Sequence, residues 1–280
     1  QQARRVVQPV VDQVMRDSDT LVGLTALKQH DEYTYVHCVN VSILSVRMGM
    51  LLGLGRSELA NLGVAALLHD AGKIAVPLEV LRKPGQLDEA EWAAIRRHPI
   101  EGVRIVSRLP GLSELMLDSM RVAFEHHMYV DHSGYPKVKD ARPLGTFSRI
   151  VAVADIFDAV TSHRAYRRRP MTAHEALRLL LGREREHFDP IVLDSLVRTV
   201  GLYPAGTVLR TLSGRLLLAV HPNSADPARP VCRDLAFELS EESAEAMAQA
   251  PDAPLPDDDP VACVVSPDDF YVDVEGLLAA

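Results

Sequence analysis

The sequence predicts an all-α fold with a small β-containing tail at its C-terminal end. Aromatic residues make up only 5% of the chain, and aliphatic residues with alanine dominate a hydrophobic fraction of 47%. This composition favours helix packing, because β-sheets are enriched in aromatic and β-branched side chains. Apolar residues also recur at helical spacing over most of the chain up to Val200, and a strand pattern appears only after Gly201.

The composition is that of a folded globular protein and narrows the classes of partner. The chain has 280 residues, 24% of them charged, and a net charge of -8. This length allows one large domain or two small ones. The negative charge argues against a nucleic-acid polymer as a partner. A small anionic substrate stays open, because a metal site supplies positive charge locally.

No segment carries a targeting or cross-linking signal. No stretch approaches the roughly 18 uninterrupted apolar residues of a membrane-spanning helix, and no secretory signal pattern opens the chain. We therefore expect a cytoplasmic location and no membrane contact through this segment. Cys38, Cys232 and Cys263 lack C-x-x-C spacing, which predicts inert thiols rather than a disulfide framework or a zinc ribbon. The chain begins with Gln1 rather than Met, which suggests that an N-terminal module precedes it.

Residues 1–30 are predicted to form a helical linker region. Their apolar side chains recur at helical spacing and make one stripe, which contains Val6, Val7, Val10, Val11, Val14 and Met15. The stripe could belong to the core or could pair two subunits. A homodimer is therefore one of two open interpretations.

Capping and breaking residues mark the predicted helices. A helix from about Tyr33 to Leu52 is closed by Gly53 and Gly55, and Ser57 is the expected N-cap of the next, which reaches His69-Asp70 and ends at Gly72 and Pro77. Asp88 with Glu91 predicts a capping box, as does Thr172 with Glu175, and Asp189-Pro190 pairs an N-cap with a first-turn proline. Further helices are expected near 113–129, 146–163, 172–182 and 190–200.

The C-terminal part has a different character. Residues 207–212 and 215–220 predict a β-hairpin whose turn contains Ser213-Gly214. From about residue 222 the chain is rich in Pro, Asp, Glu and Ala, and the stretch from Pro251 to Pro260 is expected to be a solvated acidic connector.

The histidine pattern predicts a metal site. His69 and Asp70 end an apolar helix, where an unpaired buried charge is costly and a bound cation compensates it. A carboxylate beside an imidazole can bridge two metals, as in two-metal hydrolytic sites. Other candidates raise this expectation: His37, His98, His126, His127 and Asp155. Such a set suits Fe, Mn, Co, Ni or Zn better than Mg or Ca. Asp158 stays open between a supporting acid and a surface carboxylate, and His30, His163, His174, His187 and His221 are interpreted as surface or structural.

The local sequences around these residues resemble the HD-GYP phosphodiesterases. Their H-D-x-G-K-x-x-x-P signature is matched from His69 to Pro77, and later blocks follow in order over about residues 20–205: His98-Pro99 with Gly102, His126-His127, Asp131 to Pro136, and Ala154 to Ala159 with Thr161, Arg164, Tyr166 and Arg167. The resemblance implies a helical HD-domain bundle and divides the chain into a linker region (1–30), an HD-GYP domain (31–205) and a hairpin with an acidic tail (206–280).

The resemblance also implies a metal centre that hydrolyses cyclic di-GMP to pGpG and then to GMP. The matching metal ligands are His37, His69, Asp70, His98, His126, His127 and Asp155, with Asp70 as the bridging carboxylate. Asp70 and Lys73 are the expected catalytic residues. The expected substrate contacts are Lys73, Gly134, Tyr135, Pro136, Arg164 and Arg167. The implied cofactors are divalent Fe or Mn ions, and a diguanylate cyclase is an implied partner.

Three departures from the HD-GYP pattern bear on this expectation. Tyr33 stands where some members carry a glutamate for a third metal, which favours two metals. Met128 replaces the usual glutamate after the paired histidines, and His132 replaces the usual glycine after Asp131. None of them removes a matched ligand. Two alternatives stay open beside the enzyme: a receptor or interaction module that binds without cleaving, and hydrolysis of another phosphate ester, including other cyclic dinucleotides.

Overall fold

The computed structural model describes residues 33–108, 114–139, 142–162, 169–223, 225–235, 252–265 and 274–279. The helical linker region predicted over residues 1–30 lies outside these residues, as do Arg164 and Arg167. Tyr33 begins the first described helix, but its side chain also lies outside the description.

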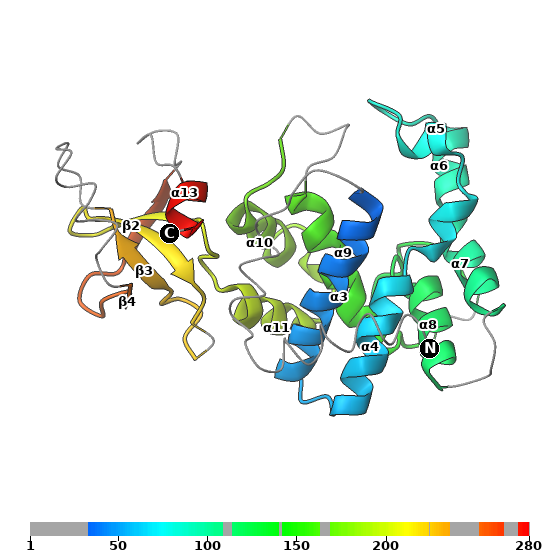
Figure 1. The fold of residues 1–280 in the computed structure, drawn as a ribbon, viewed down its shortest axis with the longest axis horizontal. Coiled ribbons are helices and arrows are strands. Elements are labelled where there is room, and N and C mark those ends of the chain that lie inside the picture. The colour runs from blue at the N-terminus through cyan, green and yellow to red at the C-terminus, as the bar shows by residue number, and fades with distance from the viewer. Residues whose placement is uncertain are drawn as a thin grey trace.

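Helices form the larger part of the described chain, as the composition predicts. They carry the labels of Figure 1 and have the following bounds: α3 (Tyr33–Leu51), α4 (Arg56–Leu68), the 3₁₀ turn η1 (Ala71–Ala75), α5 (Leu78–Leu81), α6 (Glu89–Ile95), α7 (His98–Val106), α8 (Glu114–Glu125), α9 (Thr146–Thr161), α10 (Ala173–Leu181), the 3₁₀ turn η2 (Arg185–His187), α11 (Pro190–Val200) and α13 (Val274–Ala279).

Most predicted helix starts are confirmed. The Asp88 carboxylate accepts a hydrogen bond from the backbone N–H of Glu91, and Thr172 caps α10 in the same way. Asp189 caps α11. The prediction for Ser57 is wrong, because α4 begins at Arg56 with Gly55 as its N-cap. The cause is Glu58, whose carboxylate accepts from the Gly55 N–H at 2.8 Å and so fixes the start two residues earlier.

Two predicted helices end earlier than expected. α4 stops at Leu68, and Gly72 lies inside the following 3₁₀ turn instead of ending the helix. α8 stops at Glu125, so His126 and His127 lie in the turn after it and not on a helix that reaches residue 129. A helix that reached residue 129 would need the Val130 N–H on the His126 carbonyl, but Val130 donates to the His187 carbonyl at 3.1 Å instead.

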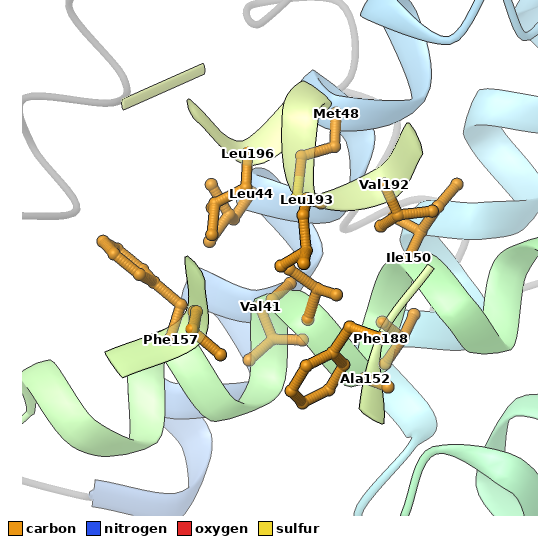
Figure 2. Close-up of a cluster of buried hydrophobic side chains, with 14 of the residues drawn as sticks. Val41, Leu44, Met48, Ile150, Ala152, Phe157, Phe188, Val192, Leu193 and Leu196 are labelled. Carbon is orange, nitrogen blue, oxygen red and sulfur yellow. The ribbon is translucent and has the colours of Figure 1, made fainter. Parts of the chain in front are cut away.

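The core of the bundle lies between α3, α9 and α11 (Figure 2). Val41, Ile150 and Leu196 are 0% exposed within it. Each such aliphatic side chain stabilises the fold by about 1.5–3 kcal/mol on burial. The apolar character of α9 explains its central place, since nearly every residue from Ile150 to Ala154 is fully buried. Asp155 and Asp158, on the same helix, are therefore carboxylates carried into the interior by apolar neighbours.

The C-terminal part forms a five-stranded antiparallel sheet in the order β4-β3-β2-β1-β5. Its strands are β1 (Val208–Thr211), β2 (Leu216–His221), β3 (Val231–Asp234), β4 (Ala253–Pro254) and β5 (Val261–Val265). The predicted hairpin is confirmed as β1 and β2, and Gly214 supplies the positive φ of 93° that its turn needs.

The prediction of an acidic tail without further strands after the hairpin is wrong. Three of the five strands lie in it, so the all-α fold class is only approximate. The stretch expected to be a solvated connector contains Leu255, which is 3% exposed and packs beside Leu217 and Cys232. Leu255 also donates its N–H to the Pro230 carbonyl at 2.9 Å. A short apolar run between prolines and acids is thus enough to close one edge of the sheet.

Figure 1 shows the sheet at one end of the molecule, with α10 and α11 between it and the remaining long helices. The helical bundle ends with α11 at Val200, the first strand begins at Val208, and only the short α13 follows the strands. The domain boundaries near residues 30 and 205 stay predictions. No described helix combines the length and apolarity needed to span a membrane. All three cysteines are free, with Cys38 and Cys232 buried and Cys263 exposed.

Candidate metal centre

The structure brings all seven predicted metal ligands together in the helical bundle. α3 supplies His37, the turn after α4 supplies His69 and Asp70, the start of α7 supplies His98, the turn after α8 supplies His126 and His127, and α9 supplies Asp155. All except His127 are buried. Their ligand atoms form groups whose members lie within 4.8 Å of one another.

Asp70 lies between two of these groups. Its Oδ1 is 3.4 Å from Nε2 of His98 and 3.8 Å from Nε2 of His126. Its Oδ2 is 3.3 Å from Nε2 of His69 and 3.7 Å from Nε2 of His37. Each carboxylate oxygen therefore faces a different pair of imidazoles, which is the arrangement required of a bridging ligand.

Asp155 makes a second connection across the same space. Its Oδ1 is 3.0 Å from Nε2 of His37 and 3.8 Å from Nε2 of His69, and its Oδ2 is 3.7 Å from Nδ1 of His127. Asp70 and Asp155 thus both face His37 and His69.

Backbone carbonyls fix the orientation of three imidazoles. Nδ1 of His69 lies 2.6 Å from the Ala66 carbonyl, and Nδ1 of His98 lies 2.7 Å from the Ile95 carbonyl. Nδ1 of His126 lies 3.0 Å from the carbonyl of Ala123. A carbonyl oxygen only accepts, so each Nδ1 carries a hydrogen, and the ring in its neutral form presents a bare Nε2 to the centre.

His37 is oriented by a carboxylate instead of a carbonyl. Its Nδ1 lies 2.7 Å from Oδ2 of Asp158, which also accepts from the Ser162 hydroxyl at 3.0 Å. The sequence allows two interpretations of Asp158, as an acid that supports a metal ligand or as a surface carboxylate. The structure decides for the first, because Asp158 is 3% exposed. Acids that hold a ligating imidazole in this way fix its tautomer and raise its basicity.

The charge states of Asp70, Asp155, His98 and His126 suit cation binding. Burial raises the pKa of the Asp70 carboxyl, but the neighbouring Lys73 ammonium outweighs it and holds that pKa well below the usual range. Burial opposes ionisation of Asp155 too, and the hydrogen bond with His37 keeps its pKa well below the usual range. Burial lowers the pKa of His98 and, more strongly, that of His126. Ionised carboxylates and neutral imidazoles are the forms that bind metals.

The residues present fit a metal ion. Nε2 of His98 lies 3.1 Å from Nε2 of His126. Two bare nitrogen lone pairs repel at that separation unless a cation lies beside them. His69 Nε2 and Asp70 Oδ1 are buried and make no hydrogen bond with the described residues. Such buried polar atoms are costly, and a metal satisfies all of them at once.

Gly72 explains how two ligand segments come so close. A Cβ at this position would lie 1.9 Å from the His98 carbonyl oxygen and 2.5 Å from the Gly102 nitrogen. The 3₁₀ turn after His69-Asp70 therefore packs backbone to backbone on the start of α7. No residue with a side chain fits there, which accounts for glycine in the matched motif.

Lys73 lies at the rim of the centre. Its Nζ is 2.5 Å from Oδ2 of Asp70, and its side chain is 19% exposed. The ammonium is therefore both paired with the candidate bridging carboxylate and accessible to an anion. Its predicted contact with a phosphate stays a prediction.

The loop of Gly134, Tyr135 and Pro136 packs against a candidate ligand. The Tyr135 ring lies 4.6 Å from the His127 ring, and its N–H donates to the His127 carbonyl at 3.0 Å. A Cβ on Gly134 would lie 1.9 Å from that carbonyl oxygen. The loop thus lies beside the centre, as expected, and its contact with substrate stays a prediction.

His187 anchors this loop, a role that the sequence did not reveal. Its Nδ1 lies 3.1 Å from Oδ2 of Asp131, whose Oδ1 accepts from the N–H and the hydroxyl of Ser133. The Tyr129 ring stacks on His187 at 4.5 Å. His187 was expected to be surface or structural, and the structure gives it a positioning role. Its only sequence signal is its place three residues before Pro190, far from the loop in the chain.

Two of the three departures now have a local description. Met128 is 6% exposed, so an apolar side chain occupies the place of the usual glutamate. His132 is exposed and has a φ of 61°, a left-handed conformation that glycine adopts without strain. The usual glycine at that position is thereby explained. Within the described residues, His132 belongs to none of the groups that could hold a metal.

A family comparison now decides the identity of the fold. The HD domain model matches residues 13–192, more than half of the chain. The chain belongs to the HD domain family. Bd1817, described as a HDG"Y"P protein from Bdellovibrio bacteriovorus, has a similar fold, with a TM-score of 0.56 and 20% identity over 69% of this chain and 60% of that one. The HD domain bundle predicted from the motifs is confirmed.

Curated relatives of this HD domain protein carry enzymatic names. It is 38% identical over 214 residues to "Cyclic di-GMP phosphodiesterase PA4108" of Pseudomonas aeruginosa, covering 76% of this chain and 50% of that protein. It is 34% identical over 172 residues to "3'3'-cGAMP-specific phosphodiesterase 2" of Vibrio cholerae, covering 61% of this chain and 32% of that protein. The predicted membership of the HD-GYP group is confirmed, and the chain spans half or less of these relatives' lengths.

Proposed function

We propose that this chain is a metal-dependent phosphodiesterase that hydrolyses cyclic di-GMP to pGpG and, more slowly, to GMP. The observation that carries the proposal is Asp70, whose two oxygens face different histidine pairs. The names of the relatives agree with it. The catalytic residues of the proposal are Asp70 and Lys73.

The proposed centre holds two divalent transition metals, Fe or Mn. His37, His69 and Asp155 would hold one ion, and His98, His126 and His127 the other, with Asp70 shared. One observation supports two ions rather than three: Tyr33 stands where some HD-GYP members carry a glutamate for a third metal. Nitrogen and oxygen ligands of this kind suit Fe and Mn.

The side chains of this centre divide the chemical work. When bound, the metals polarise the phosphate and bring the pKa of water towards neutrality. Asp70 remains ionised and supplies negative charge between the two histidine pairs. Lys73 places its ammonium at the exposed rim, where it stabilises charge on the non-bridging phosphate oxygens. Tyr135 covers His127 and excludes water from that side.

The alternative is a receptor that binds a cyclic dinucleotide, or a diguanylate cyclase, without turnover. Met128 and His132 favour it, because they replace residues usual in the family. The complete set of seven candidate ligands favours the enzyme. A third option, cleavage of another cyclic dinucleotide, is favoured by the cGAMP-specific name of one relative.

Replacement of the shared carboxylate tests the proposal. We expect Asp70→Asn to lose metal and to lower turnover of cyclic di-GMP at least a thousandfold, measured with Mn or freshly reduced Fe and product separation by chromatography. Asp194→Asn, at an exposed position on α11, is the matched control. Unchanged turnover in Asp70→Asn contradicts the enzyme, and tight binding without cleavage by the wild-type chain identifies the receptor.

A further inference from the structure

A cation lies between two aromatic rings next to the metal centre. The Arg96 guanidinium carbon is 5.6 Å from the centroid of the Trp92 ring and 6.0 Å from that of the Tyr135 ring. Tyr135 in turn contacts His127. Arg96 is therefore one aromatic ring away from a candidate metal ligand.

The local sequence explains how the three residues meet. Trp92 and Arg96 are four residues apart, so they share one face at the end of α6. α7 begins two residues later at His98, which ties this face to the metal centre. The Tyr135 ring reaches Arg96 from the loop after α8, a segment distant in the chain.

The exposure of these groups distinguishes them from ordinary packing. Trp92 is 43% exposed, and Arg96 is exposed as well. Among the described residues Arg96 has no carboxylate within ion-pair distance, so its donors face solvent. The next residue, Arg97, is equally exposed but has no ring contact within the described part of the chain.

An arginine that packs on aromatic rings has hydrogen-bond donors that are complementary to guanine. Its planar fork presents only donors, and the O6 and N7 atoms of guanine are two adjacent acceptors. Adenine has a donor amine in place of O6, which opposes the fork. Exposed bases also stack on indole rings and on guanidinium planes.

We propose that Arg96 and Trp92 form a guanine-recognition subsite beside the metal centre. Arg96 donates to O6 and N7 of one base, and the Trp92 ring supports its face. This inference rests on the proposed function, since a cyclic dinucleotide with a phosphate at the metals must bring a base to the rim. It assigns to Arg96 the choice between guanine and adenine.

Binding of hydrolysis-resistant phosphorothioate dinucleotides tests the subsite without turnover. Trp92 is the only tryptophan in the chain, so its fluorescence reports on this place alone. The full 280-residue chain, loaded with Mn, is titrated with the phosphorothioate forms of cyclic di-GMP, cyclic di-IMP and cyclic di-AMP. Inosine keeps O6 and N7 but lacks the 2-amine, so we expect the first two to bind alike and the third about tenfold or more weakly.

Variants separate hydrogen bonding from charge and from folding. Arg96→Met should reduce the preference for cyclic di-GMP over cyclic di-AMP by about tenfold, whereas Arg96→Lys should keep part of it, because an ammonium still donates to O6 and N7 but lacks the planar fork. In turnover assays the loss should fall mainly on KM. Arg97→Met is the matched control and should keep the preference of the wild-type chain.

The outcomes distinguish this inference from the proposed function. An unchanged preference in Arg96→Met overturns the subsite, and so does weak binding of cyclic di-IMP or the absence of a fluorescence response. A wild-type chain that binds with the expected preference but cleaves nothing supports the subsite and contradicts the enzyme. Loss of preference in Arg96→Met, with Arg97→Met unchanged and Arg96→Lys between the two, supports the inference.

Discussion

The interior of the metal centre and its rim are built in different ways. In the interior, backbone carbonyls hold His69, His98 and His126 by Nδ1, and the turn at Gly72 packs directly on another backbone. At the rim, side chains support one another: Tyr135 lies on His127, and Arg96 lies between two rings. The interior is therefore held by main-chain contacts, and the rim by contacts between side chains that substitution can change.

Because of this difference, we expect the interior to determine the reaction and the rim to determine which substrate is bound. A ligand set held by main-chain atoms changes little while the helices stay in place. A rim made of partly exposed side chains can change without disturbing the metals. The curated relatives carry names that specify cyclic di-GMP in one case and cGAMP in another. We expect such differences to arise from the rim.

The largest effect should follow from breaking the backbone contact of the interior. Gly72→Ala places a methyl group 1.9 Å from the His98 carbonyl oxygen, so the two ligand segments must separate. We expect a loss of about 1–3 kcal/mol in unfolding free energy and a fall in turnover of roughly a hundredfold. Gly55→Ala is the control, because its added Cβ meets only Glu58 Oε2 at 3.4 Å. Equal effects in both variants contradict the interior contact.

Removal of the acid behind His37 should weaken the interior less. Asp158→Ala frees the His37 ring to turn, since Asp158 holds its Nδ1 at 2.7 Å. We expect metal affinity to fall by roughly 10–100-fold, measured by competition with a chelator. Asp158→Asn should recover part of this loss through its amide oxygen. An Asn variant as weak as the Ala variant shows that charge, rather than orientation, is what Asp158 supplies.

Metal loading should depend on pH through His37. Burial lowers the pKa of this imidazole, but hydrogen bonds with Asp155 and Asp158 outweigh burial and raise it to about 9 in the metal-free chain. The folded chain therefore holds a proton that the unfolded chain loses near pH 6.5. Its stabilising contribution is complete below pH 6.5 and is lost as pH rises towards 9.

Metal competes for that same proton. Affinity should rise by up to about tenfold per pH unit from neutrality to about pH 9 and then level off. Titration calorimetry in buffers of different ionisation enthalpy should detect about one proton released from His37 at pH 7.5. Release of no proton would show that His37 is already neutral before the metal binds.

The smallest effect should come from the anchor of the rim loop. His187→Ala removes the contact with Asp131 and the stacking on Tyr129. We expect KM for cyclic di-GMP to rise by about threefold to tenfold with unchanged metal content, because the ligands lie elsewhere. His221→Ala, at an exposed position on β2, is the control. Loss of metal in His187→Ala would show that the loop also supports the metal ligands, and it would contradict the distinction between the interior and the rim.

The interior was far more predictable from sequence than the rim. Most interior ligands lie in short motifs with fixed spacing, so His69-Asp70 and His126-His127 could be found without knowledge of the fold. The contacts of Arg96 with Tyr135 and of His187 with Asp131 join segments that are distant in the chain, and no local pattern marks them. Asp158 could be suspected only from its spacing to Asp155.

The wrong predictions about helix ends and strands also arise from contacts that the local sequence does not show. Helix ends depend on competition for backbone groups. The Glu58 carboxylate accepts from the Gly55 N–H at the start of α4, and the distant His187 carbonyl accepts from the Val130 N–H after α8. The sheet was missed beyond its first hairpin because β3, β4 and β5 pair over long distances in the chain. A two-residue strand such as Ala253–Pro254 has no pattern of its own.

The distribution of the ligands along the chain has a consequence for protein synthesis. They extend from His37 on α3 to Asp155 on α9, and each candidate ion needs residues from separate helices. A growing chain that ends just after Asp70 holds three of the ligands and lacks the rest of both proposed ligand sets. The set of His98, His126 and His127 with Asp70 is complete once the turn after α8 has been made, whereas the set that contains Asp155 is complete only after α9, so the two ions become bindable at different stages of synthesis.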